Sequence, residues 1–200
     1  MTRQAPYNRD HALEAALTLF WRKGYHGTSL KDLEAALNMK PGSIYAAFKS
    51  KSDLFRASLD QHAELNLGLL SRCVADAPTP YLGVVDFIRQ LGNLAERPTG
   101  LRACMAMKTV LEITDTDPDL RAAALEQLDK VETYLTAVFE DARATGELPE
   151  TVEPARLAAR VQIYILGFKV NATRGGGNDS LRDVADDLAD ELLRLRRADA

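Results

Sequence analysis

The chain contains little cysteine, few histidines and no long uncharged apolar run. Its two cysteines, Cys73 and Cys104, are too few and too far apart for a disulfide framework or a cysteine-based zinc site. The best apolar run, residues 161–168, is far shorter than the roughly 20 residues that a membrane-spanning helix needs. Residues 2–8 are polar and no apolar segment follows them, so we expect no secretory signal. These absences predict a cytoplasmic protein without a membrane partner.

Catalytic signatures are also missing from the sequence. The three histidines (His11, His26 and His62) lie on different segments without metal-ligand spacing, and neither a G-x-S-x-G motif nor a glycine-rich phosphate loop is present. We therefore expect no enzyme activity, no metal and no cofactor. The hydrophobic fraction of 46% and the charged fraction of 27% are instead typical of a globular protein with a sizeable core.

Charge is unevenly distributed along the chain. Residues 1–51 hold eight basic and four acidic side chains, a net charge of +4, although the whole chain carries −4. The remaining residues therefore carry −8. A basic head on an acidic body is expected when only one end of a protein meets nucleic-acid phosphates.

Nearly every segment has the pattern of a helix. Apolar residues three and four positions apart recur, together with capping Ser, Thr or Asp residues and prolines at first helical positions. The pattern predicts nine helices at 9–23, 29–37, 41–48, 50–76, 80–97, 101–115, 118–145, 154–173 and 179–197. We expect an all-α fold with a three-helix helix-turn-helix domain at residues 1–51 and a larger helical domain at residues 52–200.

Residues 28–51 carry the most informative pattern. Two short helices separated by residues 38–40 have the length and the turn of a helix-turn-helix, whose second helix enters the DNA major groove with its N-terminal end. At that end two polar side chains would reach bases, a glycine would allow close approach, and a tyrosine and two lysines would meet phosphates. These residues are Lys40, Ser43, Gly42, Tyr45, Lys49 and Lys51. The small core between the two helices would consist of Leu33, Ala36, Leu37, Ile44 and Phe48.

The same region resembles the DNA-binding domain of the TetR repressor family over about the first quarter of the chain. The resemblance lies in Phe20, Gly24, Tyr25, Thr28, Ser29, Leu33, 41–45, Phe48, Lys51, Leu54 and Phe55. It implies phosphate contacts from Thr28, Tyr45 and Lys51. It implies base contacts from Lys40, Gly42, Ser43 and Ala46, beside Pro41 at the start of the helix. Ala46 and Ala47 stand where larger polar residues are common, which shifts the expected base contacts toward Lys40 and Ser43.

Two other interpretations remain open from the residues alone. Two short capped helices also form corners of ordinary helical bundles, which would make the chain a small-molecule-binding protein or an enzyme with no DNA binding. A DNA-binding architectural protein without an effector is the other alternative. Salt-dependent binding to duplex DNA would argue against the first, and release by a compound would argue against the second.

The last two expected helices each carry an apolar stripe. The stripes consist of Leu157, Val161 and Ile165, and of Leu181, Val184, Leu188 and Leu192. Two such helices can bury each other inside one chain. The TetR resemblance instead implies that they form a four-helix interface in a homodimer, which pairs two DNA half-sites.

Polar side chains interrupt the apolar face of the expected helix at 50–76. His62 and Asn66 lie in line with Phe55 and Leu59, and a buried polar group needs a hydrogen-bonding partner. That partner is either a neighbouring helix or a small-molecule effector, so both residues are candidate ligand contacts. The other candidates are Cys104, Lys108, Tyr134, Tyr164 and Phe168.

Cys104 lies four residues before Lys108 and eight before Glu112 in the expected central helix. A nearby ammonium makes a thiol more reactive; the alternative is an inert buried thiol beside a Lys108–Glu112 ion pair. The segment resembles a TetR subgroup with Gly-Cys-Leu here, some of whose members sense reactive electrophiles through the cysteine, although Ala103 replaces the glycine. The sequence thus predicts a dimeric repressor that binds a palindromic operator and is released by an effector.

Overall fold

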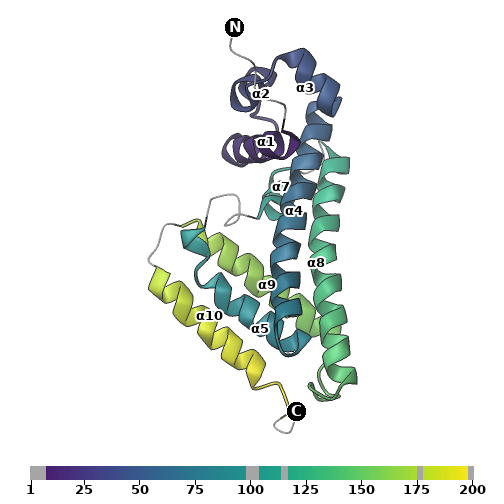
Figure 1. Cartoon of the computed structure of the whole chain (residues 1–200), viewed down its shortest axis with the longest axis vertical. Coiled ribbons are helices and arrows are strands. Elements are labelled where there is room, and N and C mark those ends of the chain that lie inside the picture. Colours follow the sequence, from purple (N-terminus) through teal and green to yellow (C-terminus); the bar gives the residue numbers. More distant parts are fainter. Residues whose placement is uncertain (1–7, 98–103, 114–116, 175–177, 198–200) are drawn as a thin grey trace.

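The computed structural model describes residues 8–97, 104–113, 117–174 and 178–197 of the chain. Over these residues it consists of nine α-helices and one short 3-10 helix, with no strand, which confirms the expected all-α fold (Figure 1). The elements are α1 (Arg9–Lys23), α2 (Leu30–Leu37), α3 (Pro41–Phe48), α4 (Lys51–Asp76), α5 (Pro80–Leu91), η1 (Leu94–Glu96), α7 (Met105–Glu112), α8 (Pro118–Ala144), α9 (Pro154–Ala172) and α10 (Asn178–Leu193).

The helix starts follow from local sequence. Asn8 and Ser50 precede α1 and α4, and their side chains accept hydrogen bonds from backbone N–H groups of the first turn. Thr79 does the same for α5, which begins at Pro80. Proline has no N–H group to leave unsatisfied at a first helical position, and it also begins α3, α8 and α9.

Several helix ends differ from the expectation. The helix expected at 80–97 ends at Leu91 and is followed by η1, where α10 comes so close that a β-carbon on Gly92 would lie 2.9 Å from the Cα atom of Arg182. The helix expected at 179–197 ends at Leu193. The helix expected at 101–115 is α7, and both ends of that range fall outside the described residues.

The helices form a small head and a longer body (Figure 1). The head consists of α1, α2 and α3 at one end of the molecule, and α4 leads from it along the body beside α8. In the body α9 packs against α8, and α5 contacts both α4 and α10. None of the helices within the described ranges is both long and apolar enough to span a membrane.

Two hydrophobic clusters hold this arrangement together. The upper cluster includes Phe20 of α1, Ile44 of α3 and Phe55 of α4, together with residues of α7 and α8. The lower cluster includes Tyr81 and Phe139 and joins α5, α8, α9 and α10. The head therefore shares its core with three helices of the body, and the division after residue 51 stays a prediction.

Candidate functional site

Helix α3 presents its outer face to solvent. Ile44 and Phe48 are buried in the upper cluster together with Leu33 of α2, whereas Ala36, which we expected in this core, is exposed. The exposed residues at the start and on the outer face of α3 are Lys40, Gly42, Ser43, Tyr45, Ala46 and Lys49, and Pro41 is half-buried. These seven of the nine DNA-binding candidates lie together on one accessible surface.

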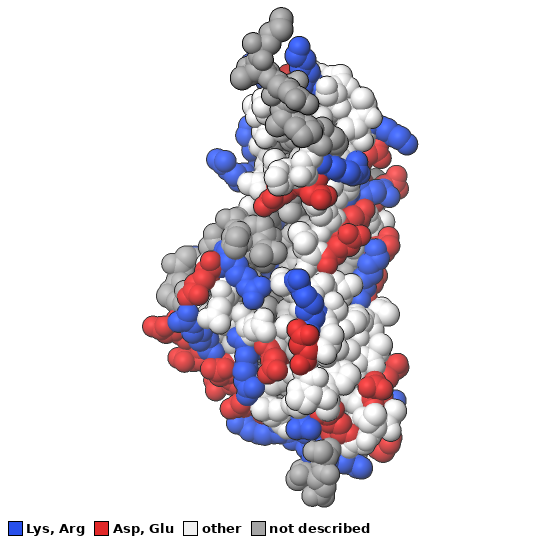
Figure 2. All heavy atoms as spheres, in the orientation of Figure 1, with Lys and Arg blue, Asp and Glu red and all other residues white. Residues whose placement is uncertain are grey.

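The N-terminal end of α3 has no acidic residue in its first turn, and no side chain of the described residues caps it. By contrast, Asp10, Asp32 and Asp53 lie in the first turns of α1, α2 and α4. An acid at this position compensates the positive end of the helix dipole. The start of α3 is therefore left positive and open to an anion. Figure 2 shows Lys and Arg side chains projecting from the head, whereas acidic side chains gather along the α10 edge of the body.

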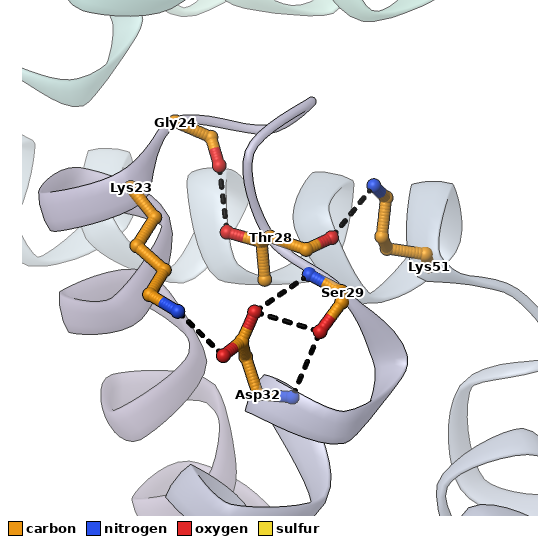
Figure 3. A network of polar contacts seen from close by, with 6 residues as sticks. All are labelled: Lys23, Gly24, Thr28, Ser29, Asp32 and Lys51. Atoms are coloured by element: carbon orange, nitrogen blue, oxygen red, sulfur yellow. Dashed lines mark hydrogen bonds and ion pairs between the residues drawn. The ribbon is translucent and has the colours of Figure 1, made fainter.

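A polar network fixes the start of α2 behind this surface (Figure 3). Ser29 Oγ accepts a hydrogen bond from the N–H of Asp32 at 3.2 Å, and the Asp32 carboxylate accepts one from the N–H of Ser29 at 2.9 Å. Lys23 of α1 donates to the same carboxylate at 2.5 Å. The hydrogen bonds from Lys23 and Ser29 hold the pKa of Asp32 well below its usual value. The carboxylate therefore stays charged and ties α2 to α1.

Two residues expected to contact phosphates are instead engaged within the head. Thr28 is 1% exposed, and its hydroxyl donates to the carbonyl oxygen of Gly24 at 2.6 Å (Figure 3). The Lys51 ammonium donates to the carbonyl oxygens of Tyr25 and Thr28 at 2.9 and 3.0 Å and lies over the Tyr25 ring. Both residues hold the turn between α1 and α2. The sequence did not indicate this because the acceptors are backbone carbonyls, which every residue has.

The same turn is held from the body by Glu112, the last residue of α7. Its carboxylate accepts a hydrogen bond from the N–H of Tyr25 at 3.0 Å. Lys108 lies 3.4 Å from this carboxylate, which is the ion pair of the alternative with an inert thiol, and also lies over the Trp21 ring. Gly24 has a φ of +75°, and a β-carbon on it would lie 2.0 Å from Glu112 Oε1. A glycine is therefore required where head and body meet.

Replacing Gly24 by alanine is expected to destabilise the fold more than Gly146→Ala. Both glycines have a positive φ, +75° and +80°, and at Gly24 ψ is 168°, a combination where alanine costs roughly 1–3 kcal/mol. Only at Gly24 does the new methyl group also displace the Glu112 carboxylate, since nothing lies within 4 Å of a β-carbon on Gly146. The lost hydrogen bond to Tyr25 adds about 1.5–3 kcal/mol to the loss in free energy of unfolding.

Urea unfolding of the two variants measures this difference. In a Glu112→Ala background the cost of Gly24→Ala should fall by the contribution of the lost hydrogen bond, because the displaced carboxylate is no longer there, and the backbone strain alone should remain. An extra cost of the same size in that background would contradict the role of Glu112.

The body contains a cavity of about 70 Å³ between α4, α5, α7, α8 and α9, which we call the inner cavity. Most of its walls are apolar. Its polar side chains are His62, Asn66, Gln127, Gln162 and Lys169. The structure thus brings together three ligand candidates, His62, Asn66 and Cys104. The sequence analysis missed Gln162 and Lys169, although both lie on the same side of α9 as buried apolar residues.

A surface hollow of about 440 Å³, which we call the outer hollow, adjoins the inner cavity. Cys104, Leu166 and Lys169 line both spaces, and the candidate Lys108 lines the hollow alone. Cys104 precedes α7 instead of lying within it, and its Sγ accepts a hydrogen bond from the N–H of Met107 at 3.4 Å. The two spaces therefore share part of one wall.

An open apolar groove of about 600 Å³ separates α9 from α10. It is lined by Leu181, Val184 and Leu188 of α10, three of the expected dimer contacts. Two ligand candidates, Tyr164 and Phe168, line this groove and not the inner cavity. The remaining ligand candidate, Tyr134, packs against the lower cluster.

The α9 face expected at the dimer interface is turned inward. The expected contacts Leu157, Val161, Ile165 and Leu192 are buried in the lower cluster, where a second copy cannot reach them. The exposed side of α9 carries another small and apolar set, Ile163, Gly167 and Val170, of which Ile163 is 66% exposed. The sequence contained a signal for this second apolar face, because α9 has apolar residues on both sides and such a helix is normally covered on both sides.

Comparison with known proteins identifies the family. Residues 12–58 match the family model for bacterial regulatory proteins of the tetR family, and residues 84–187 match that for the tetracyclin repressor-like C-terminal domain. The chain belongs to the TetR family. The HTH-type transcriptional repressor ComR of Escherichia coli is 26% identical over 186 residues, which cover 90% of this chain and 86% of ComR.

Solved TetR structures are similar over nearly the whole chain. A cysteine mutant of the TetR regulator CifR, complexed with 26-base-pair operator DNA, gives a TM-score of 0.82 at 26% identity and covers 96% of this chain and 98% of that one. A TetR transcriptional regulator from Chloroflexus aurantiacus gives a TM-score of 0.83 at 26% identity and covers 94% and 96%. These relatives are regulators of transcription and not enzymes. Membership of the cysteine-containing TetR subgroup stays a prediction.

Proposed function

We propose that this chain is a transcriptional repressor that binds a palindromic operator as a homodimer and is released by a small-molecule effector. The observation that carries the proposal is the exposed, positive start of α3, which has no acidic residue in its first turn. Its relatives include a repressor and a regulator solved with operator DNA. Residues 1–51 supply DNA binding, and residues 52–200 supply effector binding and dimerisation. The protein works in the cytoplasm and catalyses no reaction.

The start of α3 enters the major groove of each half-site. Lys40 and Ser43 reach base edges, and the small residues beside them allow close approach. These small residues are Pro41, Gly42 and Ala46. Tyr45 and Lys49 lie farther along the exposed face and bind phosphates. Thr28 and Lys51 act indirectly, because they hold the turn that positions α2 and α3.

The homodimer forms through the exposed side of α9 and the groove beside α10. Ile163, Gly167 and Val184 make this surface apolar and small enough for close helix packing. An exposed apolar patch of this kind is typical of a protein–protein interface. A second copy related by two-fold symmetry places two α3 helices on the two half-sites.

The effector enters through the outer hollow and binds in the inner cavity. Two helices connect this site with the head: α4 carries His62 and Asn66, and α7 follows Cys104 at the cavity and ends with Glu112 at the head. An effector that prefers one position of these helices shifts the population toward a different separation of the two heads. DNA affinity falls because the spacing of the half-sites is fixed.

Selection of bound fragments from random duplex DNA tests the function. We expect a two-fold symmetric site whose half-sites lie about one helical turn, or a multiple of it, apart. Affinity for this site should fall with salt, and Lys49→Ala should reduce the salt slope by about one for each lost phosphate contact. Lys130→Ala, which removes an exposed lysine of the body, is the control. A library without enrichment at low ionic strength would favour the helical binding protein or enzyme.

A further inference from the structure

The inner cavity is small, and its walls are mostly apolar. Its volume is about 70 Å³, and Leu59, Leu70 and Phe87 are among the apolar residues that line it. A dry cavity of roughly 150 Å³ in another protein binds benzene, whose ring has six carbon atoms. In proportion, the inner cavity holds about three non-hydrogen atoms, or about two water molecules. A ring-sized molecule is therefore too large for this cavity.

Most polar side chains of the inner cavity hydrogen-bond to other side chains. The Lys169 ammonium donates to Asn66 Oδ1 at 2.6 Å, and the Asn66 amide nitrogen lies 3.1 Å from His62 Nε2. Gln127 Nε2 donates to the Asp60 carboxylate at 2.7 Å. Because these groups already have partners within the protein, the cavity does not require a charged ligand.

Gln162 of α9 differs from these residues because one of its polar atoms is unsatisfied. The residue is 8% exposed and lines the inner cavity. Its Nε2 donates to the carbonyl oxygen of Leu128 at 3.1 Å, which fixes the orientation of the amide because a carbonyl only accepts. Its Oε1 is buried and has no hydrogen-bond partner among the described residues. A buried acceptor without a partner costs free energy, which a donor on a bound molecule would recover.

The size of the cavity and this acceptor together define a class of ligand. We infer that the inner cavity binds a neutral molecule of about three non-hydrogen atoms that carries a hydroxyl or N–H donor, of which ethanol is a simple case. The donor hydrogen-bonds to Gln162 Oε1, and the alkyl part displaces water from the apolar walls. The inference rests on the proposed function, since it names the class of effector for the cavity that this function assigns to effector binding.

Methyl NMR spectra of the unaltered protein test the inference with ethanol as the probe. Ile165 and Leu59 line the inner cavity. Ile88 is buried in the lower cluster without lining the cavity, and Leu65 is exposed on α4, so these two are the controls. Ethanol should shift the methyl signals of Ile165 and Leu59 to saturation and leave those of the controls nearly unchanged. Its dissociation constant should be about 0.5 mM or weaker, because so small a ligand makes few contacts.

Three other compounds separate size from hydrogen bonding. Methanol lacks one CH₂ group and should bind about fourfold more weakly than ethanol. Acetonitrile has as many non-hydrogen atoms as ethanol but no donor, so it should bind about threefold to tenfold more weakly. 1-Butanol is more apolar than ethanol, yet it should bind more weakly because it exceeds the volume of the cavity. An affinity that keeps rising from ethanol to 1-butanol is typical of nonspecific apolar binding and would overturn the inference.

Gln162→Met assigns the hydrogen bond. Methionine is similarly long and its sulfur is only a weak acceptor, so the variant should bind ethanol about threefold to tenfold more weakly and acetonitrile as before. Gln90→Met is the control, because Gln90 is an exposed glutamine of α5 that does not line the cavity. Equal weakening of ethanol and acetonitrile by Gln162→Met would contradict the hydrogen bond. The compound series on the unaltered protein decides the question even if the variant fails to fold.

These measurements use no DNA, so the inference and the proposed function can fail separately. If ethanol at up to about 100 mM shifts the signals of Ile165 and Leu59 no more than those of the controls, the cavity holds only water. The inference is then overturned, even for a protein that retains its selected operator. A protein that binds ethanol with the expected dependence but retains no duplex is not a repressor, although its ligand class stands.

Discussion

Gly42→Asp should abolish retention of duplex DNA while leaving the fold at least as stable as before. Gly42 is the second residue of α3, and nothing lies within 4 Å of a β-carbon placed there, so the protein itself has room for the side chain. An aspartate in the first turn also interacts favourably with the helix dipole, and any residue other than proline propagates a helix better than glycine. The same carboxylate would face DNA phosphates in each half-site. We expect a loss of affinity of about a hundredfold or more.

Ala155→Asp is a matched control for this experiment. Ala155 is also an exposed second residue of a proline-led helix, α9, but it lies in the body. Both variants add one negative charge per chain at the same helical position. Thermal unfolding should show no loss of stability for either, and filter binding should show loss of DNA only for Gly42→Asp. Equal DNA binding by the two variants would show that α3 does not contact DNA.

Ile163→Glu should convert the dimer to a monomer and thereby weaken operator binding about a hundredfold to ten-thousandfold. The side chain is 66% exposed in the single chain, so the change should leave the fold of the protomer intact. In the dimer, however, it would place an unpaired charge in a dry interface. Each protomer would then bind its half-site alone, without the gain in effective concentration that the linked partner provides.

Leu65→Glu provides the comparison, because Leu65 is 54% exposed on α4 and does not line the groove between α9 and α10. Sedimentation should report a monomer for Ile163→Glu and a dimer for Leu65→Glu. A dimeric Ile163→Glu variant would show that the chains associate through another surface.

The parts of this fold that the sequence predicts are those with local causes. Ser50 and Thr79 determine helix starts because each cap bonds within its own first turn. Helix ends depend on distant neighbours: α5 stops where α10 passes Gly92, and no local pattern locates α10 there. Gly92 lies inside the helix expected at 80–97, but the sequence alone does not show that α10 packs against it.

The same distinction applies to the candidate site. The outward face of α3 follows from the inward positions of Ile44 and Phe48, which the apolar spacing marks. Thr28 and Lys51 have residue types suited to phosphate contacts, yet their partners are carbonyl oxygens of the preceding turn. On α9 both sides are apolar, and packing against α8, with smaller contributions from α5 and α10, decides which side is buried. The spacing of apolar residues therefore identifies the faces of a helix, and tertiary contacts determine which face is buried.

The hydrogen bond from the Tyr25 N–H to the Glu112 carboxylate determines which substitutions at these two positions can break it. Its donor is a main-chain N–H, so any residue other than proline at position 25 still offers it, whereas the acceptor exists only in the side chain at position 112. A genetic screen can select mutants that still repress a reporter gene when the effector is present. Such a screen should therefore recover many different substitutions at position 112. At position 25 the same screen should recover proline and few other substitutions that act through this bond.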